Sequence, residues 1–129
     1  MPLQQIASLM PIQRGYFYFA PSGYHVLIDS EKTFVINVDP PIRHCRPNLD
    51  VFLKTAAEIF GDALIATILS GANEDGALGM ETVRRYGGKT LVQDPRTCEI
   101  STMTKAALGR IDPDFLGSPE EIGHYLKSL

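Results

Sequence analysis

Residues 65–80, Ile65-Ala-Thr-Ile-Leu-Ser-Gly-Ala-Asn-Glu-Asp-Gly-Ala-Leu-Gly-Met80, decide the fold class of this chain. An apolar run over 65–69 ends in a glycine-rich loop that contains Asp75, and a helical pattern begins directly behind it. Such an order is typical of α/β domains, where ligands bind at the carboxyl end of a buried parallel strand. The stretch therefore predicts a central parallel strand followed by a functional loop.

The second half of the chain alternates between helical and strand patterns. Asn48 is a favourable N-cap, and the apolar residues behind it recur at helical spacing up to Gly61. The alternation predicts an α/β fold, with a doubly wound, mostly parallel sheet flanked by helices. The predicted strands are 64–69 and 89–93, and the predicted helices are 49–60, 76–86, 101–108 and 120–129.

The first third of the chain has a different pattern. Residues 16–20, 24–29 and 33–38 are short runs rich in aromatic and β-branched side chains, separated by turn signals. They predict an N-terminal antiparallel ribbon of three strands. Residues 4–14 show no clear period and predict a loop, and the three prolines within 39–47 exclude a helix or a central strand there.

Composition narrows the class of protein. The 129 residues fit a single domain with a net charge of −3, and no basic run of the kind that binds nucleic acid is present. No apolar stretch approaches the roughly 20 residues of a membrane span, and the N-terminus lacks a secretory signal pattern. Cys45 and Cys98 are isolated, which favours reduced thiols. We expect a cytoplasmic protein without membrane insertion or nucleic-acid binding.

Four motifs, in order, resemble the catalytic domain of the chemotaxis protein-glutamate methylesterase family, CheB. They are Phe19-Ala-Pro-Ser-Gly-Tyr-His25, Pro40-Pro-Ile-Arg-His-Cys-Arg-Pro-Asn-Leu-Asp50, Leu69-Ser-Gly-Ala-Asn-Glu-Asp-Gly-Ala-Leu-Gly79, and Val92-Gln-Asp94 followed by Thr102-Met-Thr-Lys-Ala-Ala107. The resemblance runs from about residue 12 to the end of the chain, and it implies a doubly wound α/β domain with a Ser-His-Asp triad.

In that family the triad hydrolyses glutamate methyl esters on chemoreceptors, and many members also deamidate glutamine. By resemblance, Asp75 is the triad acid, which would orient the base histidine and stabilise its imidazolium. Gly71 and Ala72 would place a backbone N–H near the oxyanion. The resemblance implies a methylated chemoreceptor as partner, and neither a cofactor nor a metal.

The chain departs from the family in two respects. The family's nucleophilic serine and base histidine lie in motifs ahead of the matching region, so we expect a single CheB-type domain over residues 1–129 that lacks both. The family's Gly-Met-Gly is Gly71-Ala-Asn73 here, and its Gly-Met-Pro is Thr102-Met-Thr104. We therefore expect the chain to be incomplete or inactive alone.

Other interpretations of the same residues are weaker. Asp75 could be an acid at the start of its own helix. None of the candidate serines Ser22, Ser70 and Ser101 stands in a tight glycine-flanked elbow, and His25 and His44 match positions outside the family's triad. The spacing of the two histidines, Cys45 and Cys98 matches no known zinc site. A phosphate loop is disfavoured by the aspartate inside it.

Two functions of different classes remain. The chain is either part of a working carboxylic-ester hydrolase or a non-catalytic remnant that binds a receptor or signalling partner. Absence of the family's first two strand–helix units would leave a sheet edge and an apolar surface bare, and such edges seek partners. We expect a homo-oligomer, or a partner that covers the edge.

Overall fold

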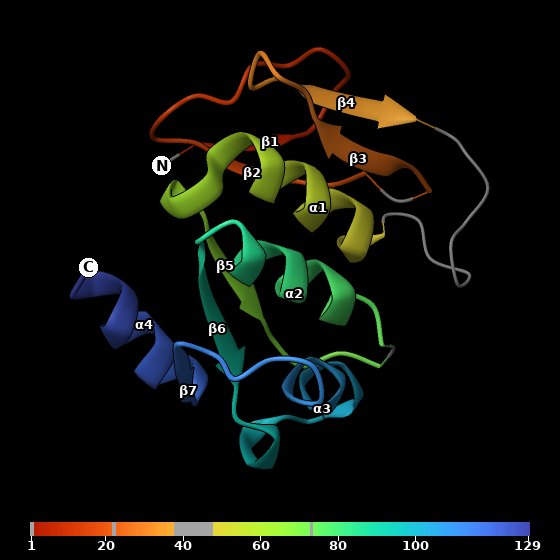
Figure 1. Cartoon of the computed structure of the whole chain (residues 1–129). Coiled ribbons are helices and arrows are strands. Elements are labelled where there is room, and N and C mark those ends of the chain that lie inside the picture. Colours follow the sequence, from red (N-terminus) through yellow and green to blue (C-terminus); the bar gives the residue numbers. More distant parts are fainter. Residues whose placement is uncertain (1, 22, 38–47, 73) are drawn as a thin grey trace.

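A computed structural model describes residues 2–21, 23–37, 48–72 and 74–129 (Figure 1). The strands form a two-stranded parallel pair β1–β2, a two-stranded antiparallel pair β3–β4, and a three-stranded parallel sheet in the order β5-β6-β7. Figure 1 shows the two N-terminal pairs above the parallel sheet, with helix α1 alongside the β3–β4 pair. Fold class and parallel sheet are as the sequence predicts.

The N-terminal part differs from the predicted three-stranded ribbon. Strands β3 (His25–Ile28) and β4 (Phe34–Asn37) pair in antiparallel fashion, which confirms that half of the prediction. Strand β2 (Phe17–Phe19) instead runs parallel to β1 (Leu3–Gln5), and β1 overlaps the start of the segment 4–14 that was predicted as a loop. The prediction failed because it grouped strands that are neighbours in the sequence, and because the three residues of β1, all exposed, are too few to show an alternation.

The parallel sheet is built from β5 (Ile65–Ile68), β6 (Lys89–Gln93) and β7 (Phe115–Gly117). The first two were predicted, but β7 was not, since three residues before a proline are too few to show a period. Helices α2 (Ala77–Arg85) and α3 (Thr102–Leu108) connect the strands, and α4 (Pro119–Lys127) follows β7.

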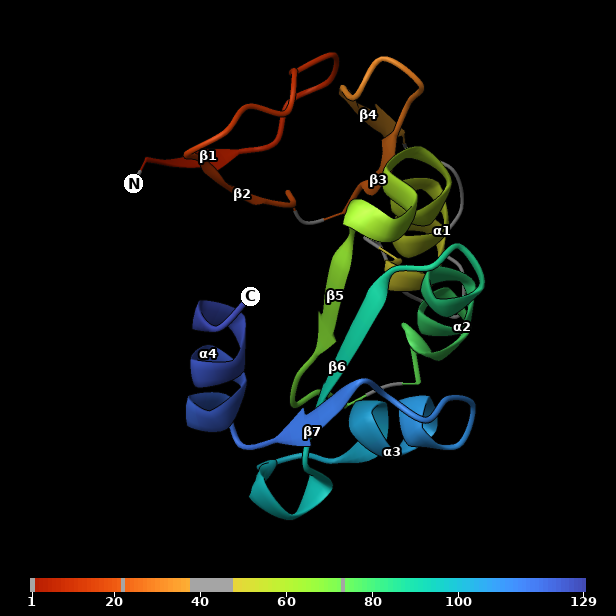
Figure 2. The same cartoon turned by 60° about the vertical axis from the view of Figure 1, so that its left-hand side comes forward.

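Helices cover both faces of this sheet, as expected of a doubly wound fold. Figure 2 shows α4 on one side of β6 and β7, with α1 and α2 on the other side. Helix α4 begins with a capping box, in which Ser118 Oγ accepts the Glu121 N–H and Glu121 Oε1 accepts the Ser118 N–H. Of the helices within the described residues, none is long and apolar enough to cross a membrane.

Helix α1 (Leu49–Phe60) joins two apolar clusters. One surface of α1 packs against β3 and β4, and the other packs against α2 and the parallel sheet. The cluster at the sheet comprises Leu53, Ala57, Ala66, Ile68, Met80, Val83, Val92, Ala107 and Ile111. Because α1 and α2 run side by side with their first turns together, the loop between β5 and α2 reaches the first turn of α1 (Figure 1).

Candidate active site at the carboxyl end of strand β5

The loop after β5 is held by groups from the loop after β6. Gln93 ends β6, and its Oε1 accepts the Ser70 N–H at 3.0 Å while its Nε2 donates to Thr97 O at 3.2 Å. Ser70 Oγ donates to Ile100 O at 3.0 Å and accepts the Ile100 N–H at 3.2 Å. The Ser70 hydroxyl is thus used in joining two loops, which is a structural role.

Gly71 continues this junction. Its N–H donates to Ile100 O at 3.1 Å, and its carbonyl accepts the Met103 N–H at 3.1 Å. A Cβ at this position would lie 2.7 Å from Met103 Cε, a contact that the flexible end of the Met103 side chain can relieve by moving. Among the described residues, none accepts a hydrogen bond from the Ala72 N–H. Of the two predicted oxyanion donors, the Gly71 N–H is already used, and the Ala72 N–H has no acceptor among the described residues.

Asp75 is buried, with 4% of its surface exposed. Its Oδ2 accepts the Leu49 N–H at 2.5 Å and its Oδ1 accepts the Asp50 N–H at 3.1 Å. These donors belong to the first turn of α1, where N–H groups lack partners within the helix and the helix dipole favours negative charge. The carboxylate therefore caps α1, and not the helix that its own loop begins. The position suits an ionised carboxylate that is fixed in one orientation.

In return, the side chain of Asp50, which lies in α1, caps the start of α2. Its Oδ1 accepts the Gly76 N–H at 3.0 Å and the Gly79 N–H at 2.7 Å, both at the start of α2. Gly76 has φ of 103°, a conformation that glycine adopts readily and other residues rarely do. A Cβ on Gly79 would meet Leu53 Cβ at 2.7 Å, so α1 and α2 touch closely beside these bonds.

Asp94 stands at the carboxyl end of β6 and is paired with Arg96. The Arg96 Nη2 donates to Asp94 Oδ2 at 2.6 Å, and the Arg96 N–H donates to Asp94 Oδ1 at 3.0 Å. These hydrogen bonds hold the pKa of the half-buried Asp94 carboxyl below its usual range. Asp94 thus shapes the loop that carries Thr97, which Gln93 in turn contacts.

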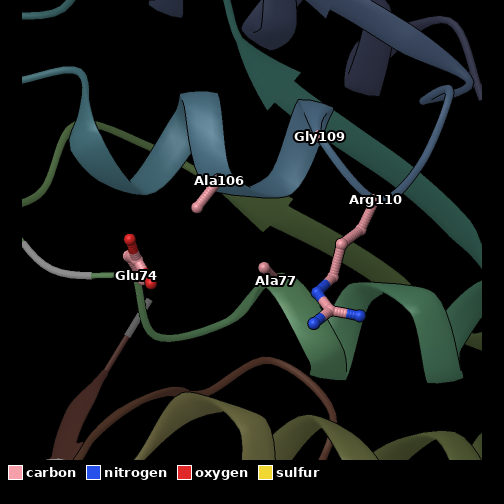
Figure 3. Close-up of a pocket in the computed structure, with 5 residues that line it drawn as sticks. All are labelled: Glu74, Ala77, Ala106, Gly109 and Arg110. Atoms are coloured by element: carbon pink, nitrogen blue, oxygen red, sulfur yellow. The ribbon is translucent and has the colours of Figure 1, made fainter.

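A cavity of about 390 Å³ lies beside the Asp75 turn, between α2 and the end of α3. It is lined by Glu74, Ala77, Ala106, Gly109 and Arg110. Figure 3 shows Glu74 and Arg110 toward opposite ends, with the two alanines between them. Arg110 Nη1 donates to Glu81 Oε2 at 3.1 Å. The cavity therefore offers one acidic group and one anchored cation across a space left by small side chains.

The remaining candidate residues are not assembled into a site within the described part of the chain. His25 lies buried in β3, and Ser101 precedes α3 as its N-cap. Cys98 is a free thiol beside Thr104, and no group of three His, Cys, Asp or Glu side chains among the described residues could hold a metal ion. Ser22, His44 and Cys45 lie outside the described residues.

Sequence reasoning assigned no role to Asp50 or to Gln93. Both occur in the motifs quoted above, but each acts through a hydrogen bond to a residue more than 20 positions away. The available signal for Asp50 was its place in the first turn of a helix, where acids are common for local reasons. That local explanation concealed the long-range contact.

Sequence comparison establishes the family. A profile of the CheB methylesterase family matches residues 1–126. The chain belongs to this family. A Leptospira interrogans protein, named as a candidate protein-glutamate methylesterase/protein-glutamine glutaminase, is 41% identical over 111 residues, which are 86% of this chain and 58% of that protein. Protein-glutamate methylesterase FrzG of Myxococcus xanthus is 37% identical over 94 residues, 73% of this chain and 28% of that protein.

Structural comparison agrees with the family. The crystal structure of the Thermotoga maritima CheB methylesterase catalytic domain superposes with a TM-score of 0.90 at 28% identity. The superposition covers 95% of this chain and 67% of that domain. The chain is therefore a partial CheB domain by comparison with its relatives, with the loop of Asp75 inside the matched region.

Proposed function

We propose that this chain contributes the acid of a Ser-His-Asp triad in a chemotaxis methylesterase, which hydrolyses glutamate methyl esters on chemoreceptors. The observation that carries the proposal is Asp75, which follows a parallel strand and is buried with its carboxylate fixed by two N–H donors. A carboxylate held in this way can orient a histidine and stabilise its charged form without taking the proton.

The serine and histidine of the proposed triad come from polypeptide outside these 129 residues. The Ser70 hydroxyl is already bonded to Ile100, and His25 is buried in the antiparallel pair. In the proposed reaction the serine attacks the ester carbonyl, methanol leaves with a proton from the histidine, and water hydrolyses the acyl-enzyme. Relatives named as protein-glutamine glutaminases suggest that ammonia replaces methanol as leaving group when glutamine is the substrate.

The oxyanion of this reaction would be stabilised by the Ala72 N–H. A donor in such a site must be free to point at the charge that develops in the transition state. The Gly71 N–H donates to Ile100 O, which leaves Ala72 as the better candidate of the two.

We propose that the polypeptide that supplies the serine covers the outer edge of β5. β5 pairs with β6 on one side. Ile65 at the start of β5 is 42% exposed, and Leu69, the residue after β5, is 49% exposed. Phe17 and Phe19 on β2 are also exposed, at 57% and 45%. Such surfaces favour strand addition and apolar packing. In the isolated chain a second copy would take that place, giving a dimer or larger species.

The direct test is an assay of methanol release from a methylated chemoreceptor. We propose that the protein acts in the cytoplasm. The protein would be produced both as these 129 residues and within its complete reading frame. We expect release from the complete protein, its loss in Asp75→Asn, and its retention in Asp62→Asn, a control in the turn after α1. Retention of full activity in Asp75→Asn would refute the triad role.

The edge proposal has its own test. Sedimentation equilibrium of the 129-residue chain is expected to show a dimer or larger species that dissociates when Ile65 and Leu69 are changed to Lys. A monomer that binds no hydrophobic dye would contradict it.

A second function is favoured by the junction of two loops that differ from the family. Gly71 uses both its N–H and its carbonyl to bind the 100–103 segment, so the two loops that differ from the family are joined to each other. A protein of this kind could bind a methylated receptor without hydrolysing the ester. Co-sedimentation with receptor-bearing membranes, without methanol release and without effect of Asp75→Asn, would support this function over the first.

A further inference from the structure

Asp50 and Asp75 form a closed pair of reciprocal caps. The N–H of Asp50 donates to Asp75 Oδ1 at 3.1 Å, while the side chain of Asp50 accepts the N–H of Gly76, the residue next to Asp75, at 3.0 Å. The Asp75 side chain therefore holds the backbone of Asp50, and the Asp50 side chain holds the backbone of the residue that follows Asp75. The two are 25 positions apart in the sequence, so this ring of bonds depends on how α1 and α2 pack.

The Asp75 turn depends on this pair more than an ordinary turn would. Gly76 has φ of 103° and, as glycine, has no side chain that would hold the turn in this conformation. Its N–H is fixed by Asp50 Oδ1, and the same oxygen accepts the Gly79 N–H at 2.7 Å. Because the two donors stand at the positive end of α2, a charged carboxylate binds them more strongly than a neutral acceptor does.

We propose that Asp50 is a positioning residue for Asp75. By fixing the Gly76 turn it sets the direction in which the Asp75 carboxylate points, and it influences the reaction only through Asp75. The consequence for catalysis rests on the proposed function, whereas the structural coupling does not. Substitution of Asp50 therefore loosens the bonds that Asp75 makes to α1, although the Asp50 side chain takes no part in them.

The test uses two variants of graded severity. Asp50→Asn keeps an oxygen that accepts hydrogen bonds but removes the charge, and Asp50→Ala removes both. The readout is amide hydrogen exchange at Leu49 and residue 50, whose N–H groups donate to Asp75 and not to the Asp50 side chain. We expect about tenfold faster exchange in Asp50→Asn and a larger increase in Asp50→Ala, the size of a lost charge-assisted hydrogen bond.

The control separates coupling from general loss of stability. Ser118→Ala weakens the distant cap of α4 and would raise exchange only through global unfolding. Leu91 is buried in β6, so its exchange rate serves as the reference for exchange through global unfolding. If exchange at Leu49 in Asp50→Asn increases no more than at Leu91, the coupling is absent and the proposal is overturned. Should Asp50→Ala fail to fold, the Asn variant still decides the outcome.

The effect of the Asp50 substitution on catalysis is measured in the complete protein that contains this chain. We expect Asp50→Asn to lower kcat for methanol release about tenfold with KM little changed, because the side chain touches no substrate. An unchanged kcat together with faster exchange at Leu49 would overturn the catalytic consequence of the proposal. If the wild-type protein releases no methanol, the proposed function fails, and the exchange experiment still tests whether Asp50 positions Asp75.

Discussion

Gly79→Ala is expected to destabilise the chain, although alanine is the better helix former. Gly79 lies in the first turn of α2, where its added Cβ would stand 2.7 Å from Leu53 Cβ and 3.1 Å from Asp50 Cα. Both atoms are at or next to the backbone of α1, so the contact is relieved only by moving one helix away from the other. The substitution also strains the 2.7 Å bond from the Gly79 N–H to Asp50.

The change in the free energy of unfolding of Gly79→Ala is the sum of two opposing effects. Replacing glycine by alanine inside a helix contributes about 0.5–1 kcal/mol of stability. Overpacking a closely packed contact costs about 1–3 kcal/mol. The upper half of this range applies to Gly79→Ala, because the new Cβ would meet atoms at or next to the backbone, which cannot move aside as the end of a flexible side chain can. The net loss is about 1–2.5 kcal/mol. With a denaturant slope of about 2 kcal/mol/M for a chain of this size, that corresponds to a decrease of about 0.5–1.2 M in the urea midpoint.

Gly123→Ala is the matched control. Gly123 lies in the interior of α4, and a Cβ there would have no atom within 4 Å. This variant is expected to gain about 0.5–1 kcal/mol, so the two glycine substitutions should have opposite signs. The assay is urea unfolding followed by far-UV circular dichroism. A Gly79→Ala variant as stable as the wild type would refute the close contact of α1 and α2.

Three further predictions concern other parts of the structure. Gly71→Ala should cost less than about 1 kcal/mol in urea unfolding, because its Cβ meets the flexible end of Met103; a loss above 2 kcal/mol would argue against this. Ser118→Ala should lose about 1 kcal/mol with the cap of α4, and no change would mean that the capping box does not form in solution. The Ser118 N–H holds the pKa of Glu121 below its usual range, so its stabilisation is present above about pH 4.3 and is lost as pH falls through the lower folded value. The stability difference between wild type and Glu121→Gln should therefore shrink between about pH 6 and about pH 3, and a constant difference would contradict the assignment.

Much of the fold could be predicted from local patterns. The helices and the two strands on either side of α2 have enough residues to show their period, and their alternation points to a parallel sheet. The family could also be named from four short motifs. Strand β7 and the pairing of β1 with β2 could not be predicted, since three-residue strands have no detectable period and their partners are set by packing.

For the candidate site, the sequence predicted that Asp75 lies in the loop after strand β5, but it could not show which groups the Asp75 carboxylate binds. An acid ahead of a helix suggests a cap on that helix, whereas the oxygens are turned to the first turn of α1. Similarly, Gly71 and Ala72 look equivalent as N–H donors in the sequence. The neighbouring 100–103 segment occupies one and leaves the other available.

The sequence by itself determined the α/β class, the family, and the position of Asp75 at the carboxyl end of a parallel strand. These features depend on short-range order, namely apolar periodicity and contiguous motifs, which any stretch of chain carries within itself. The tertiary structure alone decided that Asp75 caps α1, that Asp50 caps α2, and that β1 pairs with β2. Both depend on single hydrogen bonds or short pairings between distant residues, and such contacts exist only after the helices and strands have packed.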